Sequence, residues 1–417
     1  TEIYTRLFVG SSDVYKRQAF MHTDKFDFDT LPNRNDMGCA KWNRRTPAQR
    51  EANAVPLTIA DMDFLCAPCV MEAVEKAARH GVYGYTDADA PYYEAVVGWM
   101  ARRHDWAIEP EWVVPQNGIV PAMSVAVRVF TEPGDGVLIQ TPRYGPFAMS
   151  VEMNGRVPVY TRLCLGEDGY YRMDWEDMER KAADPRVKLF MLCSPHNPSG
   201  RIWTPEELRE MARICREHDI AVVSDEIHFD LELDGTHTVF LKAAPEMTSR
   251  AIVLTAPSKT FNTAGLQLSN VIIPDADIRA RYRARAHADG YSNVSYFGYH
   301  ATLAAYRHGD AWLDALLAYV RGNFAFLAEW LAEHLPKVRL LPAQGTYLAW
   351  TDWQAFGLSG EALQTFLREE ALVAANPGAM FGEGGEGHYR LNLAVPRAAL
   401  ARELDRILAA AKRRGLA

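Results

Sequence analysis

The sequence predicts an α/β fold built around a mostly parallel sheet. Short apolar runs of the kind found in buried parallel strands recur along the chain, and each is followed at once by a turn or loop. Helical patterns lie between them, and one of these opens with the capping signal Thr204-Pro-Glu-Glu207. The four clearest apolar runs begin at Gly136, Val187, Asp219 and Ala251.

Composition narrows the class of protein. A chain of 417 residues predicts about two domains, and its 48% hydrophobic and 24% charged residues are typical of globular proteins. The net charge of -8 argues against a nucleic-acid partner. No apolar run approaches the roughly 18 residues of a membrane helix, so we expect a cytoplasmic protein without a membrane partner.

The six cysteines are spread along the chain, which fits a reducing compartment. Cys66 and Cys69 form a C-x-x-C pair, which we interpret as two ordinary thiols near a helix start, with redox or metal chemistry as the alternative. We expect no bound metal.

Four segments are predicted. Residues 1–20 lack clear periodicity and are interpreted as a non-native extension before a start at Met21. Residues 21–60 form an N-terminal arm, residues 61–305 a large domain, and residues 306–417 a smaller C-terminal domain. A helical stripe of Trp312, Leu316, Tyr319 and Leu327 is predicted to be core.

Lys259 is the candidate around which the other site residues are arranged. It follows the apolar run Ala251-Ile-Val-Leu254, so its amine is expected at a strand end. A partly desolvated amine loses proton affinity and can act as nucleophile and base. This chemistry suits a Schiff base with pyridoxal phosphate (PLP), and a solvated surface lysine is the alternative.

Asp225 ends another apolar run, where a buried carboxylate needs a cationic partner. A protonated pyridine nitrogen is such a partner and would keep a PLP ring electron-withdrawing. The alternative is a solvated aspartate. His228 is expected near the same ring, or in a purely structural role.

Two strand-end loops carry further candidates. Tyr144 is placed to stack on a flat ring, with core packing as the rival explanation. Asn197 lies between two prolines, which restrict the backbone that carries its amide, so it could donate to a phenolate oxygen or simply close a turn.

A phosphate site is indicated at Asn117-Gly118. This turn leads into an apolar helix whose first free N–H groups, at Ile119 and Val120, could bind phosphate. An ordinary turn before a core helix is the alternative. Tyr83 and Tyr85 lie in a glycine-marked loop and either pack there or reach a ligand.

Arg390 lies in a predicted strand after a glycine-rich loop. Its two-pronged guanidinium could clamp a carboxylate, or form a surface ion pair. The glycine-rich run before it is no dinucleotide fingerprint, because it precedes a strand instead of linking a strand to a helix.

Two further runs are the most specific, Ser224-Asp-Glu-Ile-His228 and Phe381-Gly-Glu-Gly-Gly-Glu-Gly387. Taken together, these stretches resemble the fold-type I PLP enzymes of the aspartate aminotransferase superfamily. Within that superfamily the two runs resemble the MalY/PatB-type cystathionine β-lyase (C-S lyase) family and separate it from general aminotransferases. The other stretches that carry the resemblance are Lys41-Trp42, Ala60–Phe64, Gly84-Tyr85, Ser194–Gly200, Ala256–Asn262, Gly345–Trp350, Asn376–Met380 and Tyr389–Leu393.

The resemblance implies a large domain with a mostly parallel seven-stranded sheet and a smaller α/β C-terminal domain. It implies that Lys259, Asp225 and Tyr144 are catalytic: Lys259 links to PLP, Asp225 pairs with the pyridine nitrogen, and Tyr144 stacks on the ring. Asn197 would bond the ring oxygen, and Arg390 the substrate carboxylate.

The resemblance further implies that Ile119, Val120 and Ser258 bind the phosphate and that Tyr85 reaches it from a second subunit, so a homodimer is expected. One position departs from the superfamily pattern. Many members carry an arginine eight residues after the lysine, and here that residue is Gln267.

Three functions are considered. The first is a β-lyase that cleaves cystathionine or related cysteine S-conjugates, which are small amino-acid thioethers. An aminotransferase uses the same residues and is the second. The third is a regulatory binding protein without turnover, which the presence of both Lys259 and Asp225 disfavours.

Overall fold

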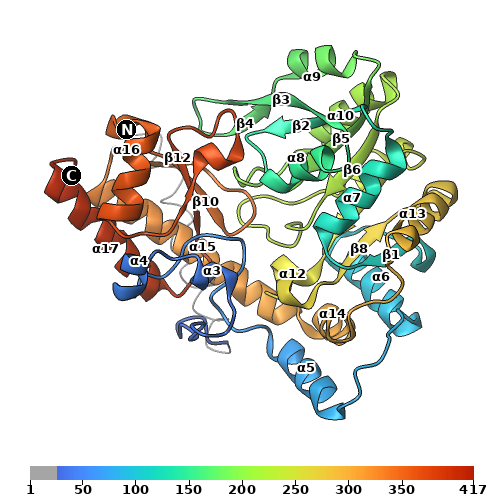
Figure 1. Cartoon of the computed structure of the whole chain (residues 1–417), viewed down its shortest axis with the longest axis horizontal. Helices are drawn as coiled ribbons and strands as arrows, with labels where there is room; N and C mark the ends of the chain where they lie inside the picture. Colours follow the sequence, from blue (N-terminus) through green and yellow to red (C-terminus); the bar gives the residue numbers. More distant parts are fainter. Residues whose placement is uncertain (1–25) are drawn as a thin grey trace.

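The computed structural model describes residues 26–417. The predicted extension at residues 1–20 and the predicted start at Met21 therefore lie outside the described residues. Two sheets and the helices that cover them form the chain. Figure 1 shows the C-terminal sheet, in orange to red, beside the larger sheet, which is mostly green to yellow.

The large sheet has eight strands in the order β1-β8-β7-β6-β5-β2-β3-β4. Adjacent strands pair in parallel from β7 through β6, β5 and β2 to β3, whereas β8 runs antiparallel to both of its neighbours. The strands are β1 (Val113–Gln116), β2 (Gly136–Thr141), β3 (Val157–Leu165), β4 (Tyr171–Met173), β5 (Val187–Cys193), β6 (Ala221–Asp225), β7 (Ala251–Thr255) and β8 (Ser269–Ile272).

The predicted α/β class with a mostly parallel sheet is confirmed, but the strand number differs from the expected seven. The additional strand is β4, three residues long, which pairs antiparallel with the end of β3. A tight turn joins the two strands, and Gly169 adopts a φ of 83° there. A strand this short has too few residues to show an alternating pattern in the sequence.

Helices pack on the large sheet, whose central strands β2, β5, β6, β7 and β8 are buried along nearly their whole length. The helices of this part of the chain are α5 (Pro68–His80), α6 (Ala90–His104), α7 (Ile119–Phe130), α8 (Gly145–Glu152), α9 (Trp175–Ala182), α10 (Pro205–Glu217), α11 (Phe240–Ala243), α12 (Pro257–Thr260), α13 (Ala276–Ala288) and α14 (Tyr296–His308). Of these, α5 packs on α14. The predicted capping box is present at the start of α10, where Thr204 and Glu207 bond reciprocally.

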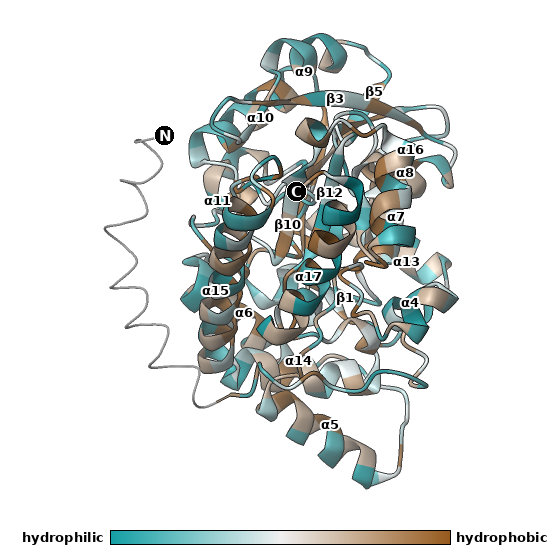
Figure 2. Cartoon of the chain, turned by 90° about the vertical axis from the view of Figure 1, so that its left-hand side faces the viewer, coloured by the Kyte–Doolittle hydropathy of each residue, from teal (hydrophilic) through white to brown (hydrophobic). Residues whose placement is uncertain are grey.

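The predicted helical segment after His300 contains a break at Gly309, which separates α14 from α15 (Asp310–His334). A Cβ atom at Gly309 would lie 2.4 Å from the ring of Phe261, so only glycine fits at this position. The predicted stripe of Trp312, Leu316, Tyr319 and Leu327 is buried, as expected. Figure 2 shows hydrophobic and hydrophilic residues alternating along α15 and α17.

The C-terminal part holds a four-stranded antiparallel sheet in the order β11-β12-β10-β9. Its elements are β9 (Arg339–Leu340), β10 (Leu348–Asp352), α16 (Gly360–Thr365), β11 (Asn376–Pro377), β12 (His388–Asn392) and α17 (Arg397–Arg414). The boundaries at residues 60 and 305 remain predictions, although the two sheets fall on either side of the second one.

The predicted N-terminal arm contains two short helices, α3 (Ala40–Asn43) and α4 (Pro47–Glu51). The arm packs on the C-terminal part, where Trp42 and Val55 contact Ala399. Over residues 26–417, no helix combines the length and the apolar character needed to cross a membrane.

Candidate active site

Four predicted site residues follow neighbouring parallel strands at the same edge of the large sheet. Tyr144 follows β2, Asn197 follows β5, Asp225 ends β6, and Lys259 follows β7. In the sheet, Cys193 of β5 pairs with Asp225, and Asp225 pairs with Leu254 of β7. The carboxyl ends of these strands therefore bring the four side chains to one place, where open α/β sheets hold their ligands.

Asp225 is almost fully buried, and its Oδ1 accepts a 3.1 Å hydrogen bond from the backbone N–H of Ile227. Burial raises the pKa of Asp225 to about 7, and the nearby Lys259 opposes that rise in part. The alternative interpretation of Asp225 as a solvated aspartate is therefore excluded. A cation held against this carboxylate would keep it ionised at neutral pH.

Lys259 lies in the short helix α12, and its Nζ donates a 2.6 Å hydrogen bond to the carbonyl oxygen of Ala60. The pKa of Lys259 is lowered to about 8, because burial and the Arg390 charge lower it by more than Asp61 and Asp225 raise it. An amine with this pKa is partly unprotonated near neutral pH. It can therefore act as a nucleophile and as a base.

Arg390 lies in the middle of β12 and is buried, so the surface ion pair considered from the sequence is excluded. Its Nη1 donates to Oδ1 of Asn197 at 2.8 Å, and its Nη2 donates to Oδ1 of Asn376 at 2.9 Å. The guanidinium carbon lies 4.9 Å from the ring centroid of Phe381. Burial lowers the pKa of Arg390 to about 10, and these contacts fix the plane of its fork.

Tyr144 and His228 complete the inner part of the site. Tyr144 is half-buried at the start of α8, and burial together with the Asp225 charge raises the pKa of its hydroxyl. His228 is buried, and burial lowers the pKa of its imidazole well below the usual range, with Lys259 and Arg390 adding to the effect. Its Nδ1 has no hydrogen-bond partner among the described residues.

The predicted phosphate turn has the expected geometry. Gly118 adopts a φ of 85° directly before α7, whose first residues are Ile119 and Val120. The Oε1 atom of Gln267 lies 3.1 Å from the position that a Cβ on Gly118 would take, so this exposed side chain borders the turn. Ser258 is half-buried beside Lys259 in α12.

Tyr85 is not brought to this site by its own chain. Its side chain is 96% exposed on the loop after α5, whereas the ring of Tyr83 packs against Tyr296 and Phe297. Both Cys66 and Cys69 are free thiols at the start of α5, as expected. Within residues 26–417, no group of three or more His, Cys, Asp or Glu side chains is arranged to hold a metal ion.

The chain matches the family described as Aminotransferase class I and II over residues 52–407. It is 42% identical over 385 residues to Cystathionine beta-lyase PatB of Bacillus subtilis (strain 168), covering 92% of this chain and 99% of that protein. The chain belongs to the aminotransferase class I and II family. It is also 35% identical over 378 residues to Protein MalY of Escherichia coli (strain K12), covering 90% of this chain and 96% of that one.

Solved structures of this family agree. Cystalysin from Treponema denticola, which contains a pyridoxal 5'-phosphate cofactor, matches with a TM-score of 0.89 and 36% identity, covering 93% of this chain and 99% of that one. The PLP-bound C-S lyase from Staphylococcus hominis matches with a TM-score of 0.85 and 32% identity, covering 92% of this chain and 98% of that one. The predicted MalY/PatB-type family, the fold-type I fold and the PLP cofactor are confirmed, and the chain is a PLP-dependent enzyme.

The residues present fit the cofactor of this family. A buried carboxyl group whose pKa is raised matches a cationic ring nitrogen, and a lysine whose pKa is lowered matches an aldehyde. The buried Nδ1 of His228 and Nε of Arg390 have no partner among the described residues, so polar atoms of the site remain available to a ligand. A helix start with a positive-φ glycine suits the phosphate.

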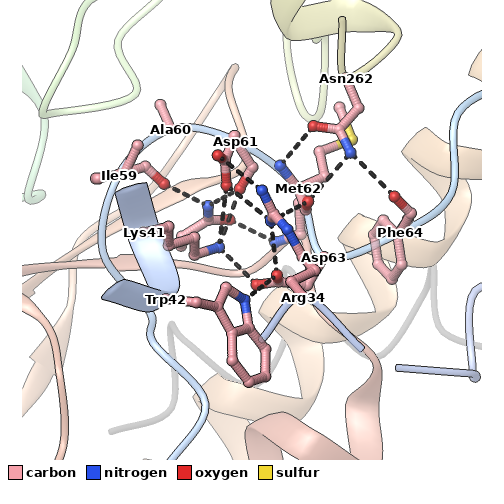
Figure 3. Close-up of polar contacts among 12 residues, drawn as sticks. Arg34, Lys41, Trp42, Ile59, Ala60, Asp61, Met62, Asp63, Phe64 and Asn262 are labelled. Atoms are coloured by element: carbon pink, nitrogen blue, oxygen red, sulfur yellow. Dashed lines mark hydrogen bonds and ion pairs between the residues drawn. The ribbon is translucent and has the colours of Figure 1, made fainter. Parts of the chain in front are cut away.

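Two features of the site were missed by sequence reasoning. The hydroxyl of Tyr347 donates a 3.0 Å hydrogen bond to the same Ala60 oxygen that accepts from Lys259. The segment Ile59–Phe64 is held by charged side chains of the N-terminal arm, as Figure 3 shows. The sequence does contain a signal for the second feature. Ala60-Asp-Met-Asp-Phe64 carries two aspartates close together, and this stretch contributes to the family resemblance, but the sequence analysis assigns the two aspartates no function.

Proposed function

We propose that this protein is a PLP-dependent carbon–sulfur β-lyase that cleaves cystathionine or a related cysteine S-conjugate to a thiol, pyruvate and ammonia. The observation that carries the proposal is the identity with the Bacillus subtilis protein named Cystathionine beta-lyase PatB along nearly the whole of both chains. The likeness to the Staphylococcus hominis C-S lyase supports it. The substrate is accordingly a small amino-acid thioether.

The cofactor would be held by the residues at the strand ends. When bound, PLP supplies an electron-withdrawing ring that stabilises negative charge at the substrate Cα. The Lys259 amine would hold its aldehyde carbon, Asp225 its pyridine nitrogen, and the Asn197 amide its ring oxygen. Tyr144 would stack on the ring, and His228 would lie beside it.

The phosphate would be bound at the start of α7. The backbone N–H groups of Ile119 and Val120 point along the helix axis, where the helix dipole favours an anion. Ser258 would add a hydroxyl. Tyr85 would add a second hydroxyl from another subunit, which its full exposure permits, so we propose a homodimer. Six free thiols support the cytoplasm as its location.

Arg390 would bind the substrate α-carboxylate through its fork. Because Asn197 and Asn376 already fix the plane of the guanidinium, the bound carboxylate would hold the substrate in one orientation. The Cα–H bond would then face the amine of Lys259. Positioning of this kind accelerates a proton transfer, because the entropy cost of orienting the reacting atoms has already been met when the substrate binds.

The amino group of the substrate would first displace Lys259 from the aldehyde carbon, and the freed amine of Lys259 would then accept the Cα proton. The electron pair left at Cα forms a double bond to Cβ as the Cβ–S bond breaks, so sulfur leaves as a thiolate and then takes up a proton. One water molecule hydrolyses the remaining three-carbon unit to pyruvate and ammonia. With cystathionine, the released thiol is homocysteine.

An aminotransferase is the second candidate, because the matched family bears that name and a PLP-bound putative aminotransferase from Clostridium difficile 630 is 37% identical to this chain. The two functions are separated by an assay of purified protein with cystathionine alone. Release of thiol and pyruvate, absent in Lys259→Ala, is expected for the lyase. Turnover that appears only when a 2-oxo acid is added would contradict it.

A further inference from the structure

The segment Ile59–Phe64, here called the strap, lies against the reacting lysine, since the Ala60 oxygen accepts a hydrogen bond from Lys259 Nζ. Its backbone is tied to the C-terminal part, since Nδ2 of Asn392 donates to the carbonyl oxygens of Ile59 at 2.7 Å and Asp61 at 2.6 Å. On the other side Asn262, three residues after Lys259, bonds the strap at Met62 and Phe64. The strap therefore connects the C-terminal part to the residues directly after α12, the short helix that carries the reacting lysine, and Figure 3 shows the bonds to Asn262.

Two charged side chains of the N-terminal arm lock the strap. The ammonium of Lys41 lies 2.6 Å from Oδ2 of Asp63, and both side chains are fully buried. Trp42 Nε1 and Arg34 Nη1 each donate to the other oxygen of Asp63 at 2.8 Å. Arg34 also binds the Asp61 carboxylate in a bidentate manner, because its Nη1 and Nη2 donate to Oδ1 and Oδ2 of Asp61 at 3.1 Å each.

A buried ion pair of this kind is weak evidence for a contribution to stability. Removing two charges from water costs about as much as their attraction returns, and an apolar pair often stabilises a fold equally well. Lys41 also donates a 3.0 Å bond to the backbone oxygen of Asp61. The network therefore fixes where one stretch of backbone lies, in addition to pairing charges.

That stretch of backbone contacts the reacting amine directly. The Ala60 oxygen accepts from Lys259 Nζ at 2.6 Å and from the Tyr347 hydroxyl at 3.0 Å. The Asp61 carboxylate, next in the chain, is the strongest of the groups that favour the protonated form of Lys259. The charged or titratable groups that bear on this amine are Asp61 from the strap, Asp225 of β6, His228 after it, Tyr347 before β10, and Arg390 of β12.

We propose that Lys41 and Arg34 are positioning residues: they lock the strap so that the Ala60 carbonyl stays against the Lys259 amine, with the Asp61 carboxylate held next to it in the chain, and so set how readily the amine takes up a proton. The proposal rests on the proposed function, because it assigns importance to the amine that accepts the Cα proton. It adds a control of that amine by the N-terminal arm.

The first experiment measures the pH dependence of Lys259 labelling by acetic anhydride in cofactor-free protein, read by mass spectrometry. Asp61→Asn keeps the shape of the side chain and removes its charge. The labelling midpoint is expected to fall by about half a unit to one unit, because an anion near an amine favours its protonated form. Labelling at pH 7 should rise roughly three- to fivefold, since a pKa that falls from about 8 to roughly 7.0–7.5 raises the unprotonated fraction at pH 7 from about a tenth to between about a quarter and a half.

Asp168→Asn is the matched control. Asp168 also forms a two-pronged pair with an arginine, Arg172, at 2.9 and 2.6 Å, but it lies between β3 and β4. Its substitution is expected to leave the midpoint unchanged. Equal midpoints for the two variants would overturn the proposal.

The second experiment separates positioning from direct electrostatics. Lys41→Met combined with Asp63→Asn removes one positive and one negative charge, so electrostatics alone leaves the Lys259 midpoint nearly unchanged. Loss of the lock predicts a fall toward the Asp61→Asn value, with thermal unfolding reporting that the protein is folded. A folded double variant whose Lys259 labelling midpoint equals that of wild type would refute the role of Lys41. If the double variant does not fold, Arg34→Met is measured in its place. This substitution frees the Asp61 carboxylate, and the Lys259 midpoint is again expected to fall.

Neither labelling experiment uses bound cofactor or turnover. Wild-type protein can therefore release thiol from cystathionine while the labelling results contradict the lock, or fail to release thiol while they support it. The two proposals fail separately.

Discussion

Oδ1 of Asn197, in the loop after the carboxyl end of β5 in the large sheet, accepts a 2.8 Å hydrogen bond from Nη1 of Arg390 in the C-terminal sheet. A side-chain amide has its acceptor on one side and its donor on the other, so this bond fixes which end faces the arginine. The Nδ2 group of Asn197 is left to face elsewhere. The residue proposed to bond the cofactor and the residue proposed to bind the substrate therefore form one unit.

Asn197→Ala is expected to damage both kinds of binding. It leaves Nη1 of the buried Arg390 without a partner, a loss of about 1–3 kcal/mol, so kcat/KM for cystathionine should fall roughly 10- to 100-fold. The absorbance maximum of the bound cofactor should also shift, because the donor to its ring oxygen is gone. Steady-state kinetics and an absorbance spectrum of the same preparation measure the two effects.

Asn376→Ala is the matched control, since Asn376 accepts from the other prong of Arg390 at 2.9 Å. It should raise KM without moving the absorbance maximum. If both variants shift the spectrum alike, Asn197 has no separate contact with the cofactor.

A pH dependence of stability is expected from Asp225 in the cofactor-free protein. Burial raises the pKa of this carboxyl to about 7, against about 3.9 in an unfolded chain. The folded state then binds more protons than the unfolded state, so the free energy of unfolding falls as pH rises from about 4 to about 7. The slope from this group is at most about 1.4 kcal/mol per pH unit.

Asp225→Asn should remove this contribution to the slope. Urea unfolding of cofactor-free wild type and variant between pH 5 and 7 measures it, and that range stays below the pKa of about 8 to which burial lowers Lys259. Loading wild type with PLP should also flatten the slope, because a cationic ring nitrogen favours the ionised carboxylate. Equal slopes in variant and wild type would show that Asp225 does not titrate there.

Much of the site could be predicted because its signals are local. Asp225 and Lys259 each follow an apolar run, and a polar residue at the end of a buried strand can be recognised from the sequence alone. The helix start at Gly118 has an equally local signal, a glycine before an apolar helix. The contact between Lys259 and Ala60 has none, because a backbone oxygen carries no side-chain identity.

The lock on the strap could not be predicted for a different reason. Lys41 and Asp63 are 22 residues apart, and a lysine in a polar stretch is ordinarily a solvated surface charge. Its complete burial follows from the way the arm packs on the C-terminal part, which no local pattern records. The strand β4 was missed because three residues show no period.

Tyr85→Phe is expected to weaken cofactor binding without changing the fold of one subunit. The side chain is 96% exposed in the isolated chain, so its hydroxyl contributes nothing to folding there, but in the proposed homodimer it reaches the phosphate of the other subunit. Loss of one hydrogen bond to a charged group predicts a Kd for PLP about tenfold higher. Titration of cofactor-free protein with PLP measures this.

Tyr83→Phe provides the comparison, since the Tyr83 hydroxyl bonds the carbonyl oxygen of Ala78 in its own chain at 2.6 Å. Its Kd for PLP should match that of wild type. Sedimentation analysis of both variants should give a dimer, and a wild-type monomer that binds PLP with full affinity would contradict the proposed contribution of Tyr85.

Gln267→Arg is expected to tighten cofactor binding. Gln267 stands where many members of the superfamily carry an arginine, and its side chain borders the phosphate turn at Gly118. An arginine would add a positive charge and two donors for the phosphate, and the exposure of the site limits the gain to roughly three- to tenfold in Kd. The gain should shrink between 50 mM and 500 mM salt, because screening weakens exposed charge pairs. Gln364→Arg is the control, because Gln364 is also exposed, on α16, and the substitution adds the same charge away from the turn. Its Kd for PLP should equal that of wild type. Equal Kd values for Gln267→Arg and Gln364→Arg would show that residue 267 does not act on the phosphate.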